Sequence, residues 1–383
     1  MLGVGGVGGI LASSLVSARR SDVTLIARGR GFDALTEKGL RVKIKERLEP
    51  LCFNVNEGDF KLISTAEAEC GAAKNQDFVL VATKAHQLTS CLDALSGLVG
   101  PETLIVPCVN GMPWWLGKEY LDASNSSASG LSACDPSSRL AREINGKQVL
   151  GSMGFISGSV RRDYSRWSSG WESSRNRLQL GDPLLGAKCG TAPRDEAHTL
   201  AGLFATTADD DQDHPVVPVI CEVVENIRGR IWDKLMINCS INAISALTQA
   251  SCGEIVDDPS ASSLLEGVVE EVTAVATAAM VRPGARPFHL TMDAETVLNT
   301  YRGQYTLKSS MQQDVEAGRP TEKDPIVRAV VELGEHLKVP TTSLNVLACL
   351  LDAQETAARN RAGVGSYYDT SSMSLPEFPK RKV

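Results

Sequence analysis

Several features that define other classes of protein are scarce in this sequence of 383 residues. None of its ten cysteines lies in a Cys-x-x-Cys pair, and its five histidines are scattered, so neither a zinc site nor a disulfide framework is indicated. No apolar run reaches the ~18 residues of a membrane span. The net charge is −7, and no basic patch carries interleaved aromatic residues, which argues against nucleic acid as a partner. We therefore expect a globular protein that binds neither membranes nor nucleic acid and keeps its thiols reduced, as in the cytoplasm.

The first twenty residues, "MLGVGGVGGILASSLVSARR", are apolar and free of acidic residues. A secretory signal carries positive charge before its apolar run, whereas Arg19 and Arg20 come after this one. Two arginines are also few for a mitochondrial transit peptide, which stays as the alternative interpretation. A nucleotide-binding turn explains more of these residues.

The glycines of this segment follow the Gly-x-Gly-x-x-Gly pattern of a dinucleotide-binding turn. The residues of the turn are Gly3, Val4, Gly5, Gly6, Val7 and Gly8. A helix-compatible run follows, and then "DVTLIAR" (22–28) reads as a buried strand. Glycine in such a turn permits the tight bend and the approach of the backbone to a pyrophosphate, which then faces the start of the helix. We therefore expect an N-terminal Rossmann-type domain.

The predicted strand ends in Arg28, where an NAD-binding site usually has an acidic residue for the ribose 2′-hydroxyl. An arginine suits a 2′-phosphate instead, which predicts NADP(H) as the cofactor. The alternative is an ordinary exposed arginine at a strand end.

Two more predicted strands end in polar residues. "DFVLVATKAHQ" (77–87) ends with Lys84 and Gln87, and "TLIVPCVNGM" (103–112) ends with Asn110. Open α/β sheets bind ligands beyond the carboxyl ends of their strands, so we expect these side chains to face the cofactor.

Only Met1 and Leu2 precede the glycine turn, whereas the first strand of such a fold normally needs about five or six residues and lies in the middle of the sheet. Either the chain begins further upstream than this sequence, or the sheet has a defective centre.

The hydrophobic pattern of the sequence changes near Glu222, after which a helical periodicity replaces the short strand-like apolar runs. The expected helices cover 264–280, 294–317, 324–337 and 342–360. The sequence thus predicts an α/β protein with two domains. The expected parts are a dinucleotide-binding domain at 1–220 with inserts at about 122–138 and 163–176, an all-α domain at 221–360 for substrate and dimerisation, and a disordered tail at 361–383.

One predicted helix, "WDKLMINCSIN" (232–242), carries Lys234, Asn238 and Asn242 at a spacing of four, which forms one slanted polar stripe. Asparagine is a poor helix former, and the other faces of this helix are apolar. The stripe is either a solvated face or a row of functional groups.

Together with the glycine turn and Arg28, the segments "TKAHQ", "VNGM", "WDKLMINCSINAISALT" and "SSMQQDVEAGRPTEKD" occur in an order that resembles the 2-dehydropantoate 2-reductase (ketopantoate reductase) family. The resemblance runs from Gly3 to about residue 358. It implies NADPH-dependent reduction of 2-dehydropantoate to pantoate, a step of pantothenate biosynthesis, with a 2-keto acid as the small-molecule partner and a homodimer as an expected assembly.

The resemblance also implies residue roles. Lys234 is expected to donate the proton to the keto oxygen, and Glu322 to act between the domains on cofactor and substrate. The expected substrate-binding residues are Asn110, Asn238, Asn242 and Ser310. The expected cofactor-binding residues are Gly3, Val4, Gly5, Gly6, Val7, Gly8, Arg28, Lys84, Gln87, Asn110 and Glu322. The chemistry agrees independently, because hydride addition to a ketone builds negative charge on oxygen and calls for a positioned acid.

The chain departs from the family pattern at three positions. Ala243 stands where the family often has proline, Cys252 where it often has a further asparagine, and Lys323 where it usually has an apolar residue. These departures concern the substrate more than the reaction type. The alternatives are therefore a reductase of another branched 2-keto acid, or a non-catalytic NADP(H)-binding paralogue.

Overall fold

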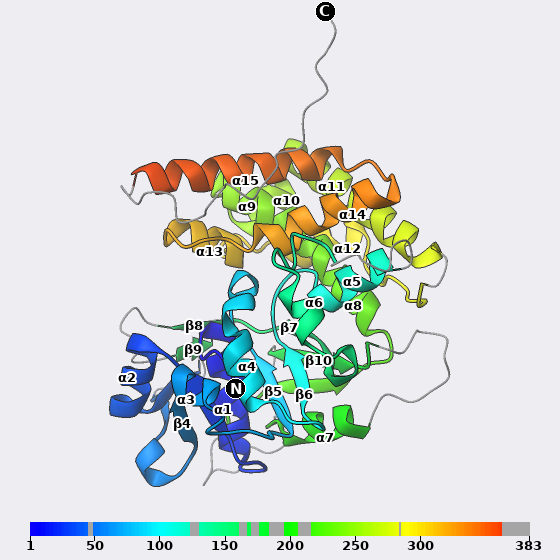
Figure 1. The fold of residues 1–383 in the computed structure, drawn as a ribbon. Helices are drawn as coiled ribbons and strands as arrows, with labels where there is room; N and C mark the ends of the chain where they lie inside the picture. Colours follow the sequence, from blue (N-terminus) through cyan, green and yellow to red (C-terminus); the bar gives the residue numbers. More distant parts are fainter. Residues whose placement is uncertain are drawn as a thin grey trace, which may run out of the picture.

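The computed structural model describes residues 1–44, 49–122, 130–160, 167–169, 176–183, 195–205, 216–282 and 285–361. The strands gather in one half of the molecule, with the N-terminus among them, and helices α9 to α15 form the other half (Figure 1). This confirms the predicted α/β class with a Rossmann-type N-terminal part and a helical C-terminal part. Parts of the expected inserts at 122–138 and 163–176, and the tail from 362, lie outside the described residues.

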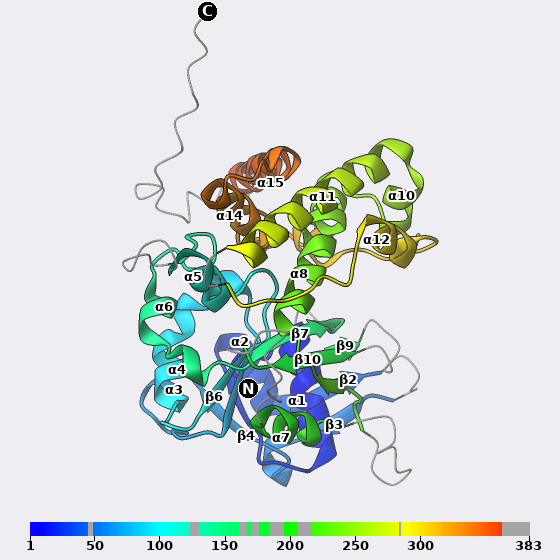
Figure 2. The same ribbon diagram turned by 90° about the vertical axis from the view of Figure 1, so that its right-hand side faces the viewer.

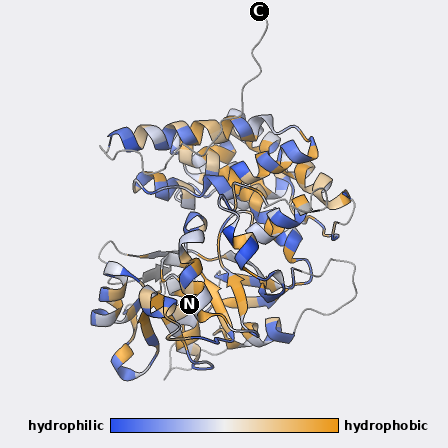
Figure 3. Ribbon diagram, in the orientation of Figure 1, coloured by the Kyte–Doolittle hydropathy of each residue, from blue (hydrophilic) through white to orange (hydrophobic). Residues whose placement is uncertain are grey.

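A parallel sheet forms the centre of the N-terminal half. Strand β1 (Thr24–Ala27) pairs with β4 (Lys61–Ser64), and β5 (Phe78–Val81) pairs with β6 (Leu104–Pro107). Strands β1, β5 and β6 are largely buried and strongly apolar, as the orange ribbons of β5 and β6 show (Figure 3), whereas β4 at the edge is more exposed. Such runs are typical of a parallel sheet covered on both faces.

Met1 and Leu2 lie between β1 and β5 and join them. The Leu2 amide donates to Leu80 O at 2.8 Å, and the Ala82 amide donates to Leu2 O at 2.9 Å. On the other side the Ile26 amide donates to Met1 O at 2.9 Å. Met1 and Leu2 therefore bridge the two strands at the level of Ile26 and Val81, with isolated bridges in place of a full first strand.

Helices cover this sheet, and smaller sheets extend it. The helices of this half are α1 (Gly6–Ala18), α2 (Gly29–Lys38), α3 (Thr65–Glu69), α4 (Leu92–Leu98), α5 (Trp114–Asp122), α6 (Arg139–Glu143) and α7 (Asp195–Leu203). Short 3-10 turns lie at Val55–Glu57, Ala85–Gln87, Thr89–Cys91 and Gly146–Gln148. Strand β10 (Arg177–Gly181) pairs with β7 (Gly151–Phe155) and β11 (Ile220–Val223). A third sheet has the order β3 (Leu51–Phe53), β2 (Leu40–Lys43), β9 (Trp167–Ser169), β8 (Gly158–Val160).

The C-terminal half is built from helices. They are α8 (Ile227–Ile237), a π-helical turn (Asn238–Asn242), α9 (Ala243–Thr248), α10 (Cys252–Asp257), α11 (Pro259–Val281), α12 (Ala294–Tyr301), α13 (Ser310–Glu316), a second π-helical turn (Asp324–Arg328), α14 (Ala329–Leu337) and α15 (Thr342–Arg361). Helix α8 runs from the strands up to the other helices, as Figure 2 shows. Within the described part of the chain, no helix is long and apolar enough to span a bilayer.

The single helix expected at 294–317 is wrong, because the chain forms α12 and α13 with a break between them. Gly303 adopts φ +76°, a left-handed conformation that favours glycine and ends helical geometry. Ser309 then caps α13, where its side chain accepts a hydrogen bond from the Gln312 amide at 3.1 Å. The break between α12 and α13 therefore comes from Gly303 and from the cap at Ser309.

One hydrophobic core crosses both halves. A single cluster of buried side chains includes Leu2 and Val79 of the parallel sheet together with Val268 of α11 and Leu347 of α15. A second cluster lies on the α1 side of the sheet and includes Ile10. The two halves are thus packed against each other through apolar side chains as well as polar ones.

Candidate active site

The polar stripe lies on one continuous helical rod, made of α8, the π-helical turn Asn238–Asn242 and α9. Asn242 Nδ2 donates to Asn238 Oδ1 at 3.0 Å and lies 3.5 Å from the Ser310 hydroxyl at the start of α13. Asn238 and Asn242 are each about 6% exposed, so the solvated-face interpretation of the stripe is wrong for them. A π-helical turn inside an α-helix is often found at a functional site, because it rotates side chains away from regular spacing.

Lys234, the third member of the stripe, points toward the carboxyl ends of strands β6 and β7. Its Nζ donates to Asn110 Oδ1 at 2.9 Å and to the carbonyl of Gly154. The same Nζ lies 5.5 Å from the centroid of the Phe155 ring. Burial lowers the pKa of Lys234 to about 8, because desolvation disfavours the ammonium, with Glu322 acting in the opposite direction. A lysine with this pKa can give up a proton near neutral pH.

Asn110 joins Lys234 to Glu322. Its amide Nδ2 donates to Glu322 Oε2 at 3.1 Å, while its Oδ1 accepts from Lys234. The Glu322 carboxylate also accepts from the Ala85 amide at 3.0 Å and from Lys84 Nζ at 3.2 Å. The side chain of Glu322 is 5% exposed, so this acid from the helical half is enclosed by groups of the N-terminal half.

Lys84 completes the network at the interface. Its Nζ lies 2.7 Å from Asp314 Oδ2, and Asp314 also accepts from Arg319 Nε at 2.9 Å. Burial alone would lower the pKa of Lys84, yet the carboxylates of Glu322 and Asp314 hold it above the ordinary value. Lys84 is therefore a permanent cation clamped between two acids of the helical half.

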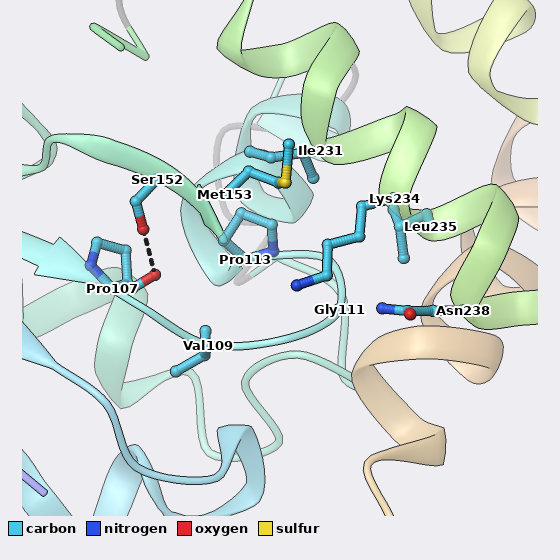
Figure 4. Close-up of a pocket in the computed structure, with 10 residues that line it drawn as sticks. All are labelled: Pro107, Val109, Gly111, Pro113, Ser152, Met153, Ile231, Lys234, Leu235 and Asn238. Carbon is cyan, nitrogen blue, oxygen red and sulfur yellow. Dashed lines mark hydrogen bonds between the residues drawn. The ribbon is translucent and has the colours of Figure 1, made fainter. Parts of the chain in front are cut away.

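A small pocket opens beside Lys234, and Figure 4 shows its lining. The lining residues are Pro107, Val109, Gly111, Pro113, Ser152, Met153, Ile231, Lys234, Leu235 and Asn238. The amine of Lys234 lies in this view between the apolar Val109 and Pro113 on one side and the Asn238 amide on the other (Figure 4). The pocket thus combines an apolar wall with three polar side chains, those of Ser152, Lys234 and Asn238.

The glycine turn lies at the carboxyl end of the Met1–Leu2 stub and leads into α1. Gly3 has φ +91°, and a Cβ there would lie 2.7 Å from Thr83 Cγ2. A Cβ on Gly8 would lie 2.0 Å from Gly3 O, and one on Gly6 would lie 2.1 Å from Gly158 O. These three glycines are required by close packing. Val4 and Val7 are partly buried against the second core cluster.

The same turn has the features of a phosphate site. Helix α1 has no side-chain cap, so its first amides are not satisfied by a capping side chain. A Cβ on Gly5 would meet no atom within 4 Å, and the Thr83 hydroxyl beside Gly3 is buried without a hydrogen-bond partner among the described residues. A helix start without a capping side chain, open space at Gly5 and the buried Thr83 hydroxyl fit the pyrophosphate of a dinucleotide.

Arg28 and the Lys84 loop flank the glycine turn. Arg28 is exposed where β1 ends and is the N-cap residue of α2, while Gln87 is half-buried and ends the 3-10 turn after β5. Strands β1 and β5 adjoin Met1–Leu2 on opposite sides, so Arg28, the turn and Lys84 share one edge of the sheet.

The structure therefore gathers Lys234, Asn238, Asn242, Ser310, Asn110, Glu322 and Lys84 at the interface of the two halves. Three further residues at this interface were not anticipated from the sequence: Gly154, Phe155 and Asp314. Gly154 and Phe155 end strand β7, whose sequence "GSMGF" carries no spacing signal for a site. Asp314 lies inside the run "SSMQQDVEAGRPTEKD", in which Glu322 is the acidic residue predicted to act at the site.

Two family models match most of the chain. "Ketopantoate reductase PanE/ApbA" matches residues 1–114, and "Ketopantoate reductase PanE/ApbA C terminal" matches residues 226–355. A 2-dehydropantoate 2-reductase of Mesorhizobium japonicum is 32% identical over 360 residues, which cover 92% of this chain and 95% of the relative.

Several solved structures share the fold of this chain. A protein assigned as a ketopantoate reductase from Ralstonia solanacearum MolK2 superposes with a TM-score of 0.74 at 29% identity, covering 93% of this chain and 97% of the other. D-mandelate dehydrogenase, solved with NADH and anilino(oxo)acetate, shares the fold with a TM-score of 0.69 at 16% identity and coverages of 93% and 97%. A dimeric ketopantoate reductase from Staphylococcus aureus shares it with a TM-score of 0.64 at 19% identity and coverages of 93% and 98%. The chain belongs to the ketopantoate reductase family of dinucleotide-dependent oxidoreductases.

Proposed function

We propose that this protein reduces 2-dehydropantoate to pantoate with NADPH as the reductant. The observation that carries the proposal is Lys234, a lysine whose pKa burial lowers to about 8 and whose Nζ is held by Asn110 and Gly154 beside the pocket. A bound NADPH would supply the hydride to the C2 carbonyl carbon. Residues 1–220 would bind the dinucleotide, and residues 221–360 would carry the substrate-binding groups.

The role proposed for Lys234 follows from its hydrogen bonds. An ammonium has three N–H donors, and Asn110 Oδ1 and Gly154 O accept two of them. The third is left for the keto oxygen. As the hydride forms a C–H bond at C2, the π electrons of the C=O group move onto the oxygen. Lys234 transfers a proton to that oxygen, which gives the alcohol. Lys234 then regains a proton from solvent.

Polar groups without charge surround the position of the substrate. Asn238, Asn242 and Ser310 offer amide and hydroxyl donors, which suit a carboxylate and a hydroxyl group. Asn110 and Glu322 act together, because the amide that holds Lys234 is itself held by the carboxylate. We propose that Glu322 fixes this alignment and reaches the ligands at the interface.

The cofactor preference is a separate part of the proposal. The exposed Arg28 at the end of β1 supports NADPH over NADH, because a guanidinium can pair with a 2′-phosphate. The dimeric relative supports a homodimer, and the nine free cysteines of the described residues suit a reducing compartment such as the cytoplasm.

The test is NADPH oxidation by the purified protein with 2-dehydropantoate and with other 2-keto acids. We expect 2-dehydropantoate to give the highest kcat/KM. If another branched or aromatic 2-keto acid is reduced with a higher kcat/KM, the protein is a reductase of that acid instead. D-mandelate dehydrogenase, which shares the fold, is the reason for including aromatic acids in the test.

The matched variant is Lys234→Ala, which removes the proposed acid. It should lower kcat by about 10²–10⁴, the usual share of a general acid, and leave the Kd for NADPH nearly unchanged. Lys61→Ala, on the exposed side of β4, is the control and should behave like the wild type. Wild-type kcat in Lys234→Ala would exclude the proposed mechanism.

A further inference from the structure

Phe155 is an exposed aromatic residue beside Lys234 that the proposed reaction does not use. The side chain is 38% exposed, and it is one of six large apolar residues in the described chain that are left so open to solvent. The Lys234 Nζ lies 5.5 Å from the centroid of its ring. An open apolar ring at a reactive group indicates contact with something other than the core.

Strand β7 aims this ring at the site. Side chains of a strand alternate between faces, so Phe155 lies on the same face as Met153, which lines the pocket. Gly154 between them has no side chain, and its bare carbonyl accepts from Lys234. The strand thus presents a carbonyl for the lysine and, one residue on, an apolar ring next to it.

The chemistry of a 2-keto acid assigns the two sides of the site. The keto carbon bears a carboxylate and a side chain, and the keto oxygen must meet Lys234. The amides of Asn238 and Asn242 form the polar side, where a carboxylate is satisfied. The side chain of the substrate is then left to the apolar groups, which are Phe155 together with pocket residues such as Val109 and Met153.

We propose that Phe155 is a specificity-determining residue whose ring forms one wall for the side chain of the substrate, so that the enzyme selects 2-keto acids with bulky, branched or aromatic side chains over small ones. This proposal rests on the proposed function, because it needs Lys234 to meet the keto oxygen. Closure of the ring over an apolar substrate side chain would remove both surfaces from water.

The experiment compares substrates of increasing size with the wild type, Phe155→Ala and Phe155→Leu. The probes are pyruvate, 2-ketoisovalerate, 2-dehydropantoate and phenylglyoxylate. We expect Phe155→Ala to lower kcat/KM for the three bulky acids by about ten- to hundredfold and to change that for pyruvate by less than about threefold. Phe155→Leu keeps most of the apolar volume and should lie between the two.

Leu264→Ala on α11 is the matched control, because Leu264 is 39% exposed and so resembles Phe155 in exposure. It should leave the ratio of kcat/KM between bulky and small acids unchanged. Thermal melts of all variants with and without NADPH check that folding and cofactor binding are intact.

Two results would overturn the proposal. An equal loss for every acid in Phe155→Ala, with a shifted pH profile, would show that the ring acts on Lys234 by a cation–π contact and not on the substrate. Wild-type kcat/KM for every acid in both variants would show that the ring does not contact the substrate. If instead the wild type binds NADPH but reduces no 2-keto acid, the proposed function itself fails, and that outcome is read from the wild type alone.

Discussion

Lys234 is the residue whose environment has the clearest functional meaning. Its amine is desolvated, yet each of its neighbours in the network is an oxygen of an amide or a carbonyl and carries no charge of its own. Nearby Lys84, by contrast, faces two carboxylates and stays charged. Two lysines at one interface thus have opposite electrostatic roles, one titratable and one fixed.

The pH dependence of the reaction follows from this environment. The protonated lysine is the donor, so activity is lost as pH rises through its folded-state pKa of about 8. We expect kcat/KM for the keto acid to be level below that pH and to fall tenfold per unit well above it, because this parameter reports the ionising groups of the enzyme form that the keto acid meets, here the NADPH complex. Rate measurements from pH 6 to 10 with saturating NADPH check this limb, and a flat profile would argue against Lys234 as the acid.

Arg28 carries the cofactor preference. A charge-assisted pair with a 2′-phosphate contributes roughly 1.5–3 kcal/mol, so Arg28→Ala should raise the Kd for NADPH by about one to two decades and leave that for NADH unchanged. Isothermal titration with both nucleotides measures the two constants. Arg142→Ala, an exposed arginine of α6, is the control. Equal affinity of the wild type for the two nucleotides would contradict the assignment.

Among the elements, the segment between α13 and α14 connects the two halves. Glu322 lies just before the second π-helical turn and accepts hydrogen bonds from Lys84, the Ala85 amide and Asn110. Glu322→Ala should lower kcat and raise KM together, because the alignment of Asn110 and the docking of the halves are both lost. It should also cost about 1–3 kcal/mol of stability, since buried donors are left unpaired.

Steady-state kinetics and thermal melts measure these effects. Glu316→Ala on α13 breaks an exposed ion pair with Lys308 and should change stability by less than about 0.5 kcal/mol. A Glu322 variant that changes stability alone, with wild-type kcat and KM, would reduce this residue to a packing role.

Local patterns account for the elements that the sequence predicts well. The glycine turn, the strands after it and α15 follow from turn chemistry and from spacing that nearby residues determine. The break before α13 does not, because it depends on the left-handed conformation of Gly303 and on the cap at Ser309 inside a segment predicted to be one helix. The contact of Lys84 with Asp314 joins residues 230 apart in the chain, which no local pattern contains.

At the scale of the molecule, the shared core matters more than the division into halves. Buried side chains of the parallel sheet and of α11 and α15 belong to one cluster, so neither half can unfold without exposing the apolar surface of the other. We expect one cooperative unfolding transition of the whole chain, with a calorimetric enthalpy equal to the van't Hoff enthalpy. Differential scanning calorimetry tests this, and two separated transitions would show independent units.

Gly6 packs against Gly158, and this contact distinguishes selection for folding from selection for catalysis within the glycine turn. A side chain on either residue would meet the backbone of the other at about 2 Å, whereas one on Gly5 would meet nothing. In a deep mutational scan scored only for folded protein, alanine should therefore be depleted at position 6 and tolerated at position 5. A scan scored for catalysis should deplete both. Glycine is thus required at position 6 for folding and at position 5 for catalysis. A tolerance to mutation averaged over the whole turn would mix these two requirements.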